Sequence, residues 1–299
     1  MTEVGREDGA RVFELSWDWP PSRDALGDIL KGLLLAAGLS WQDIVERQSR
    51  RERGVSVYCS SLQEAMDLKA RIEGGCRGEL QARLQCLGPE DWRDVWKRAF
   101  QPFALTDRFE VVPAWMRETY RPNGLPVYID TSLAFGTGLH ETTRFMAEFI
   151  DVIVGRGVET FLDVGTGTGL LAILARKTGV KKVKAIDISP EAIETARGNG
   201  ERNQCADITW ARADIAEMVP DETYDYVAAN LVTHDLMRWR DHLLAFTRPG
   251  GYLAVSGIAV EHLPPLRQHF ETASVRCEEI RKGSQWSACL YRTEGRKER

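Results

Sequence analysis

The sequence is poor in the residues that build metal sites and disulfide frameworks. Its 299 residues include only five histidines and six cysteines. No two cysteines form a C-x-x-C pair, and no histidine stands at a metal-ligand spacing from a cysteine. We therefore expect no metal site, and we interpret the cysteines as buried or incidental thiols in a reducing compartment.

Long apolar runs and an excess of positive charge are also missing. The longest apolar run, around residues 33–37, is far too short to cross a bilayer, and the charged first residues lack the apolar stretch of a signal peptide. The net charge is −5, whereas proteins that bind nucleic acid through its phosphates are usually basic. We expect a cytoplasmic protein that binds neither a membrane nor nucleic acid directly and whose acidic surface suits a basic partner.

The first ninety residues follow the order β-α-β-β-α-β. Strand patterns occur at residues 11–19, 44–49, 55–59 and 79–87, and apolar residues recur at helical spacing over 26–34 and 62–72. This order predicts a ferredoxin-like sandwich of two helices on an antiparallel sheet. Because no catalytic constellation appears in it, we assign residues 1–89 to recognition of a partner.

A tryptophan-rich linker at residues 90–125, with Trp92 and Trp96 four residues apart, precedes a second domain at residues 126–294. In this domain strands and helices alternate. Strands are expected to end near Asp163, Asp187, Ala211 and Ala229 and to follow at 252–256, 274–280 and 287–291, with helices at 170–178, 190–202, 235–247 and 260–270. The closing pair of strands forms a hairpin. The pattern predicts an α/β fold with a doubly wound, mostly parallel sheet, followed by a frayed tail at 295–299.

The most informative segment is residues 161–172, where an apolar strand ends in Asp163 and a turn opens into an apolar helix. The turn consists of Gly165, Thr166, Gly167 and Gly169, with one further threonine. Glycines leave the backbone open to a ligand, and the free N–H groups of a helix start face it. About twenty residues later Asp187, followed by Ile188, ends a second short strand, where an acid binds ribose hydroxyls. The pair predicts a cofactor that contains a nucleoside.

Two classes of cofactor fit the glycine turn. The turn satisfies the G-x-G-x-x-A fingerprint of nicotinamide dehydrogenases, which hold a pyrophosphate. Asp163 would repel a pyrophosphate but pairs well with an ammonium group, which S-adenosylmethionine offers. Asn230, at the tip of the predicted fourth strand, is placed to orient an incoming amine through its carbonyl oxygen. Asp214, after the third strand, is a candidate for contact with the adenine amino group.

Residues 133–143 read Leu-Ala-Phe-Gly-Thr-Gly-Leu-His-Glu-Thr-Thr and begin about thirty residues before the glycine turn. Together with Glu90-Asp-Trp92, Asp163-x-Gly165 and Ala229-Asn230, this segment resembles the PrmA family of bacterial methyltransferases, which modify ribosomal protein eleven of the large subunit. The family has a ferredoxin-like domain before a seven-stranded methyltransferase domain. The resemblance implies S-adenosylmethionine as cofactor, S-adenosylhomocysteine as product, and a basic ribosomal protein methylated on lysine or another amine.

Carried over position by position, the resemblance implies cofactor contacts from Thr143, Gly165, Asp187 and Asn230. It also implies that a loop covers the cofactor and forms the entry for a lysine side chain; the loop comprises Phe135, Gly136, Thr137 and Gly138. On the acceptor side, Phe135 lines the entry, His140 supports the loop and Asn230 orients the amine.

Two segments depart from the family pattern. The family's D-P-G is Asp130-Thr-Ser132 here, and its N-I-L-A-x-P-L is Asn230-Leu-Val-Thr-His-Asp-Leu236. Both surround the predicted acceptor site, where His140 and His234 are the candidates for a general base. Three alternatives stay open: methylation of another protein or of a small molecule, a nicotinamide-dependent oxidoreductase, and a non-catalytic cofactor-binding module.

Overall fold

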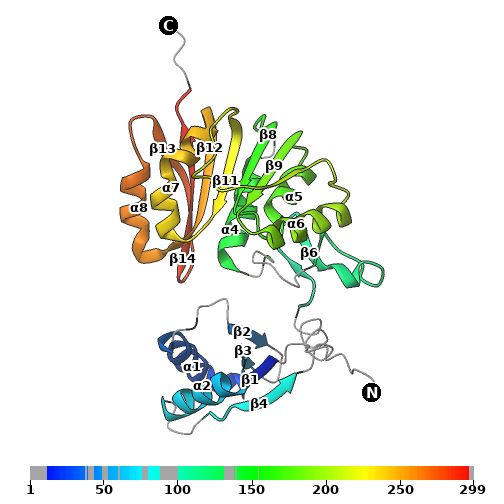
Figure 1. Cartoon of the computed structure of the whole chain (residues 1–299), viewed down its shortest axis with the longest axis vertical. Helices are drawn as coiled ribbons and strands as arrows, with labels where there is room; N and C mark the ends of the chain where they lie inside the picture. The colour runs from blue at the N-terminus through cyan, green and yellow to red at the C-terminus, as the bar shows by residue number, and fades with distance from the viewer. Residues whose placement is uncertain are drawn as a thin grey trace, which may run out of the picture. The chain divides into compact units, whose positions relative to one another are not determined.

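The chain forms two compact units, Met1–Gln101 and Pro102–Arg299. The computed structural model describes residues 12–37, 39, 44–48, 53–59, 61–75, 80–87, 100–130, 138, 140–153 and 155–295 (Figure 1). Each unit has a sheet and a hydrophobic core of its own.

The first unit has the predicted order of elements. Its strands are β1 (Val12–Trp19), β2 (Ile44–Gln48), β3 (Arg53–Cys59) and β4 (Arg83–Leu87), and its helices are α1 (Asp24–Ala36) and α2 (Leu62–Gly75), with a 3-10 turn η1 (Pro21–Arg23) before α1. The sheet order is β2-β3-β1-β4, and every neighbouring pair is antiparallel. This is the ferredoxin-like topology that the sequence predicts.

Apolar side chains from the sheet and both helices form the core of this unit. Fully buried residues include Leu15, Trp17, Leu30, Val55 and Leu68. One acid, Glu14, lies among them, and its carboxylate accepts a hydrogen bond of 2.7 Å from the Ser56 hydroxyl. That bond satisfies a polar group that burial would otherwise leave without a partner.

The last strand of the first unit is shorter than predicted. We expected it over 79–87, but β4 begins at Arg83. Side chains of α2 bind the backbone of Ala82: Lys69 donates to its carbonyl at 2.7 Å, and its N–H donates to the Glu73 carboxylate at 2.9 Å. These bonds take the place of a strand ladder there.

The second unit is built on a seven-stranded sheet. Its strands are β8 (Thr160–Val164), β9 (Lys182–Asp187), β10 (Thr209–Arg212), β11 (Tyr224–Asn230), β12 (Thr247–Ala259), β13 (Val275–Lys282) and β14 (Trp286–Thr293). The order is β10-β9-β8-β11-β12-β14-β13. The neighbours up to β12 are parallel, whereas β14 is antiparallel to both β12 and β13. The predicted doubly wound sheet with its closing hairpin is confirmed.

Helices alternate with these strands as predicted. They are α4 (Glu141–Ile153), α5 (Leu170–Lys177), α6 (Pro190–Arg202), α7 (Thr233–Phe246) and α8 (Leu263–Phe270), with a 3-10 turn η4 (Val260–His262) before α8. Contacts join α4 to α5 and α5 to α6, while α7 contacts α8, as expected of helices layered on the two faces of a sheet. The sequence analysis did not predict α4, although its buried residues recur at helical spacing.

A small three-stranded sheet precedes α4. It consists of β5 (Phe103–Ala104), β6 (Phe109–Pro113) and β7 (Leu125–Ile129), and a 3-10 turn η3 (Ala114–Met116) follows β6. The segment predicted as the tryptophan-rich linker therefore contributes two strands to the second unit, while Trp92 and Trp96 lie outside the described residues. Phe109, Val111 and Val127 of this sheet are fully buried.

Two buried asparagines, Asn199 in the last turn of α6 and Asn203 directly after that helix, hold the small sheet to the rest of the second unit. Asn203 accepts from the backbone N–H of Tyr128 at 2.9 Å and donates to its carbonyl at 2.7 Å. Asn199 accepts from the N–H of Asp130 at 2.8 Å and donates to the carbonyl of Thr168 at 2.9 Å. The end of β7 is therefore fastened to the glycine turn.

Gly257 allows the strand β12 to bulge beside the tip of β11. It is the extra residue between Ser256, which pairs with Ala288, and Ile258, which pairs with Ser287. Its φ is +89°, and a Cβ there would lie 2.0 Å from the carbonyl oxygen of Leu231. A side chain at this position would therefore force the backbone of Leu231, the residue that follows Asn230, to move.

We expect Gly257→Ala to lower the free energy of unfolding by about 3 kcal/mol, since a left-handed conformation and a backbone clash both oppose it. Gly179→Ala is the matched control, because its φ is +100° and nothing lies near its Cβ. That control should cost about 1 kcal/mol. Urea denaturation of both variants measures the difference. Equal losses would show that the approach to Leu231 is unimportant.

Candidate functional site

The parallel register of three adjacent strands brings the predicted polar residues to one edge of the sheet. β8 lies between β9 and β11, and Asp163 pairs in register with Ala185 on one side and Ala228 on the other. Asp163 lies near the end of β8, Asp187 ends β9 and Asn230 ends β11. Parallel strands end at the same edge, which is where ligands bind in doubly wound sheets.

The glycine turn leaves this edge and leads into α5. The N–H groups of Gly165 and Thr166 donate to the carbonyl of Ile186 at 2.9 and 3.0 Å, which ties the turn to β9. A Cβ on Gly165 would lie 2.6 Å from Leu231, and one on Gly169 would lie 2.9 Å from Trp210. Both glycines suit their positive φ of +73° and +81°, and Gly169 is also held by close packing, because a Cβ there would lie 3.1 Å from the Ala196 backbone.

Asp163 is buried beneath the turn, with 1% of its surface exposed. The Thr166 hydroxyl donates to Oδ2 at 2.6 Å, while Oδ1 accepts no hydrogen bond from the described residues. Burial raises the pKa of Asp163 to about 7, an effect that the Thr166 hydroxyl and the Ala172 N–H oppose and that the negative charge of Asp187 reinforces. A buried carboxylate with one oxygen that accepts no hydrogen bond is stabilised by a positively charged donor beside it.

Asp187 organises the backbone around the turn. Its Oδ2 accepts from the N–H of Gly167 at 3.0 Å and its Oδ1 from the N–H of Ser189 at 3.0 Å. The next side chain, Ile188, is 62% exposed, which is unusual for a large apolar residue. The carbonyl of Asp187 accepts from the N–H of Ala213, so the segment that follows β10 begins beside it.

Asp214 lies in that segment and accepts a hydrogen bond of 2.9 Å from the N–H of Ala216. The bond belongs to a local turn, so it accounts for one carboxylate oxygen through ordinary turn geometry. Asp214 directly follows Ala213, whose N–H contacts the carbonyl of Asp187.

Asn230 faces the first turn of α4. Its side-chain nitrogen lies 3.3 Å from the Thr142 hydroxyl and 3.5 Å from the Thr143 hydroxyl. Both threonines are buried, with exposures of 2% and 1%. Thr142 is a residue that the sequence analysis missed, although it stands next to Thr143 in the same motif.

His140 precedes α4 and adjoins the same threonine. Its Nδ1 lies 2.8 Å from the Thr142 hydroxyl, and its ring packs edge-on against Trp286, with ring centroids 5.4 Å apart. Burial lowers the pKa of His140, and the neighbouring Glu141 opposes that shift only partly. The imidazole is therefore neutral at physiological pH.

The predicted covering loop is described only at its end. Phe135, Gly136 and Thr137 lie outside the described residues. Gly138 has a φ of +93°, and a Cβ there would lie 3.2 Å from Leu170, the first residue of α5, and 3.2 Å from Phe103 of β5. The loop therefore ends between the small sheet and the helix that follows the glycine turn.

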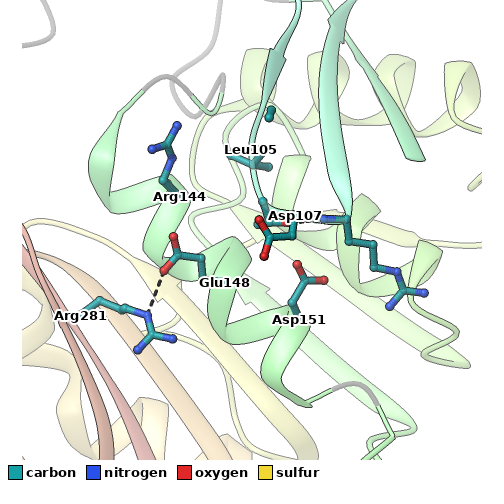
Figure 2. A pocket seen from close by; sticks show the side chains of 9 residues that line it. Leu105, Asp107, Arg144, Glu148, Asp151 and Arg281 are labelled. Carbon is teal, nitrogen blue, oxygen red and sulfur yellow. Dashed lines mark hydrogen bonds and ion pairs between the residues drawn. The ribbon is translucent and has the colours of Figure 1, made fainter. Parts of the chain in front are cut away.

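A hollow of about 770 Å³ lies beside α4 (Figure 2). Its charged lining includes Arg144, Glu148 and Asp151 of α4, Asp107 of the turn after β5, and Arg281 of β13. Glu148 and Arg281 form an ion pair of 2.9 Å. Since charges of both signs line the hollow and no predicted site residue does, it favours no single class of ligand.

Two further observations concern the described part of the chain only. Among the described residues, no cluster of three or more histidine, cysteine or acidic side chains is suited to hold a metal ion. No helix in the described ranges has the length and apolar character needed to span a membrane.

Comparison with known proteins gives one family. The sequence model described as "Ribosomal protein L11 methyltransferase (PrmA)" matches residues 37–294. A protein of that name from Burkholderia mallei is 38% identical over 206 residues, which are 69% of this chain and 65% of the relative. A protein of the same name from Pelobacter propionicus is 35% identical over 217 residues, or 71% of this chain and 70% of the relative. The match to the Burkholderia relative thus spans slightly less than two thirds of its length.

A solved structure agrees with these sequences. The ribosomal protein L11 methylase from Lactobacillus delbrueckii subsp. bulgaricus superposes with a TM-score of 0.60 at 29% identity. The superposition covers 65% of this chain and 100% of that chain. The arrangement of strands and helices over 65% of this chain is therefore one that a solved chain of similar sequence also has.

The raised pKa of Asp163 predicts how stability depends on pH. The folded protein holds this proton up to about pH 7, whereas the unfolded chain releases it near the ordinary value of 3.8. Stability must fall as pH rises from about 4 to 7, by on the order of 4 kcal/mol at most. Asp163→Asn should remove this contribution, so the variant gains stability relative to the parent over that range. Urea denaturation at several pH values measures the difference, and a constant difference would contradict it.

Proposed function

The chain belongs to the ribosomal protein L11 methyltransferase (PrmA) family, and on this premise we propose that it transfers methyl groups from S-adenosylmethionine to amino groups of ribosomal protein L11. The single observation that supports this best is the meeting of Asp163, Asp187 and Asn230 at one sheet edge. The two acids suit a nucleoside cofactor with an ammonium group, and the amide suits an incoming amine. The named relatives support the choice of acceptor protein.

The sheet edge offers a group for each part of S-adenosylmethionine. Asp163 Oδ1 is a buried acceptor without a donor among the described residues, and the ammonium group would supply one. The Asp187 carboxylate, held in place by the Gly167 N–H, would accept from the ribose hydroxyls. Exposed Ile188 gives an apolar surface for the adenine ring, and Asp214 an acceptor for its amino group. When bound, the cofactor supplies a methyl group on a positively charged sulfur.

These residues argue against a dinucleotide in the same place. The carboxylate of Asp163 would face the pyrophosphate of a nicotinamide cofactor, and like charges within a buried site repel strongly. Its raised pKa reduces that repulsion near neutral pH without providing any positive charge. No described residue of the glycine turn is a lysine or arginine, which would be needed to balance both groups.

Asn230 would align the acceptor amine. A neutral lysine nitrogen has hydrogens to donate and one lone pair that must point at the methyl group. If Asn230 Oδ1 accepts one of those hydrogens, the lone pair is turned towards the donor, and such alignment is worth many orders of magnitude in effective concentration. We assign Phe135, which lies outside the described residues, to the wall of the lysine entry.

Neither candidate base is well placed to take the amine's proton. His140 makes a hydrogen bond to Thr142 through Nδ1, and the side chain of His234 is 82% exposed beside Asp235. We propose that the ammonium group loses its proton to water as it leaves solvent, since burial disfavours its charged form. His140 then supports the site rather than acting as its base.

We assign the remaining parts of the chain to supporting roles. Residues 1–89 would recognise the protein substrate, 90–125 would link the domains and 126–294 would carry out the transfer. A net charge of −5 suits a basic acceptor such as a ribosomal protein. Action on a ribosomal protein places the enzyme in the cytoplasm.

Replacement of Asp187 tests the cofactor. We expect S-adenosylmethionine to raise the melting temperature of the parent protein and NAD to leave it unchanged. Asp187→Ala should weaken S-adenosylmethionine binding about 10- to 100-fold, because hydrogen bonds to a charged acceptor are lost. Asp221→Ala, on an exposed turn, is the control. Calorimetric titration gives the affinities. Stabilisation by NAD alone would refute the proposed cofactor.

Replacement of Asn230 tests the transfer step. With purified ribosomal protein L11 and a methyl-labelled donor, we expect the parent to label L11 and Asn230→Ala to lower kcat about 100-fold, because the amine is no longer aligned. Mass spectrometry of the product identifies the methylated amine. A parent protein that binds the cofactor yet labels another protein would refute the proposed acceptor only.

A further inference from the structure

Three side chains form a continuous hydrogen-bonded chain behind the proposed acceptor position. His140 Nδ1 lies 2.8 Å from the Thr142 hydroxyl, and that hydroxyl lies 3.3 Å from the Asn230 side-chain nitrogen. The residues come from the segment before α4, the first turn of α4 and the tip of β11. Thr142 is 2% exposed, so water does not compete for its hydroxyl.

The direction of each hydrogen bond follows from the Thr142 backbone. Its N–H donates to His140 Nδ1 at 3.4 Å, and an N–H group can only donate. Nδ1 therefore presents its lone pair to Thr142, and the ring proton is on Nε2. The threonine hydroxyl has a single hydrogen, which is directed to the same lone pair. Its oxygen is then left as an acceptor for the Asn230 NH2 group.

The direction of these hydrogen bonds decides whether Asn230 presents its Oδ1 or its NH2 group to the acceptor amine. With its NH2 group bound by Thr142, the side chain turns Oδ1 away from α4, where it can accept a hydrogen from a neutral amine. In the opposite orientation the NH2 group would donate to the amine's lone pair. That lone pair is the nucleophile, so the opposite orientation would block the transfer it is meant to assist.

We propose that Thr142 is a positioning residue which fixes the Asn230 amide in its productive orientation. The lone pair of His140 Nδ1 accepts the hydrogen of the Thr142 hydroxyl, and this leaves the hydroxyl oxygen to accept from the Asn230 NH2 group. This positioning rests on the proposed function for the role of Asn230, while the orientation itself is a property of the protein alone. Trp286 packs edge-on against the His140 ring, so the position of His140 Nδ1 is itself fixed.

Other groups around the chain maintain this arrangement. Burial lowers the pKa of His140, which keeps Nδ1 unprotonated, and Glu141 is the charged neighbour that acts on it. Thr143 adds a second hydroxyl 3.5 Å from the Asn230 nitrogen, so both hydrogens of the NH2 group can be bound on the α4 side. Replacing either threonine by a residue without a hydroxyl would remove one of these acceptors.

Two substitutions separate the hydroxyl from the shape of the side chain. Thr142→Val keeps the volume and removes the hydroxyl, whereas Thr142→Ser keeps the hydroxyl. With ribosomal protein L11 as acceptor, we expect Thr142→Val to lower kcat about 10- to 100-fold with little change in KM for S-adenosylmethionine, and Thr142→Ser to restore kcat to within about threefold of the parent.

Thr247→Val is the matched control. Thr247 is also buried, at 5% exposure, and its hydroxyl donates to the Leu243 carbonyl at 2.9 Å, at the far end of α7 from Asn230. Its loss should lower the melting temperature slightly, as should that of the Thr142 hydroxyl, but should leave kcat unchanged. Thermal unfolding of all three variants verifies that they are folded. A Thr142→Val protein with the parent's kcat would overturn the proposal.

A readout without turnover separates this proposal from the proposed function. The side-chain amide signals of Asn230 in a nitrogen-15 NMR spectrum can be assigned by their loss in Asn230→Asp. We expect them to shift in Thr142→Val and to stay in Thr142→Ser and Thr247→Val. Unmoved signals in Thr142→Val would overturn the positioning role. Shifted signals in a protein that methylates no amine would support that role and refute the proposed function instead.

Discussion

The parallel register of β9, β8 and β11 is the constraint on which the site depends. It places Asp187, Asp163 and Asn230 at one edge of the sheet, although 67 positions separate the first of these residues from the last in the sequence. The hydrogen bond from the Gly167 N–H to Asp187 then fixes the glycine turn against β9. A shift of one residue in either pairing would turn these side chains to the other face, because side chains alternate along a strand.

Around that edge, buried polar side chains fasten segments that have no sheet pairing of their own. Asn199 joins the backbone of Asp130, the residue after β7, to that of Thr168 in the glycine turn. Thr142 joins α4 to β11 in a similar way, because its hydroxyl accepts a hydrogen bond from the side chain of Asn230. Each is fully enclosed and each uses several of its hydrogen-bonding atoms. Buried polar groups with satisfied partners specify one arrangement more sharply than apolar contacts do.

Much of the fold was predictable from the sequence. Alternation and helical spacing gave the order of strands and helices in both units, and the closing hairpin gave the antiparallel strand β14. The alternating pattern predicted too long a strand before β4, because side chains rather than a neighbouring strand bind the backbone there. At Ala82 the partners are Lys69 and Glu73. The prediction also missed α4, although the buried residues of that helix recur at helical spacing.

The sequence by itself determined which residue types stand at the strand tips, and hence the class of cofactor they suit. It also placed the chain by its motifs within one family. Only the tertiary structure decided that Asp163 is buried with an acceptor atom to spare, that Trp210 and Ala196 pack closely against Gly169, and that Thr142 stands between His140 and Asn230. Burial and hydrogen-bond direction depend on neighbours far apart in the chain, and no local pattern specifies them.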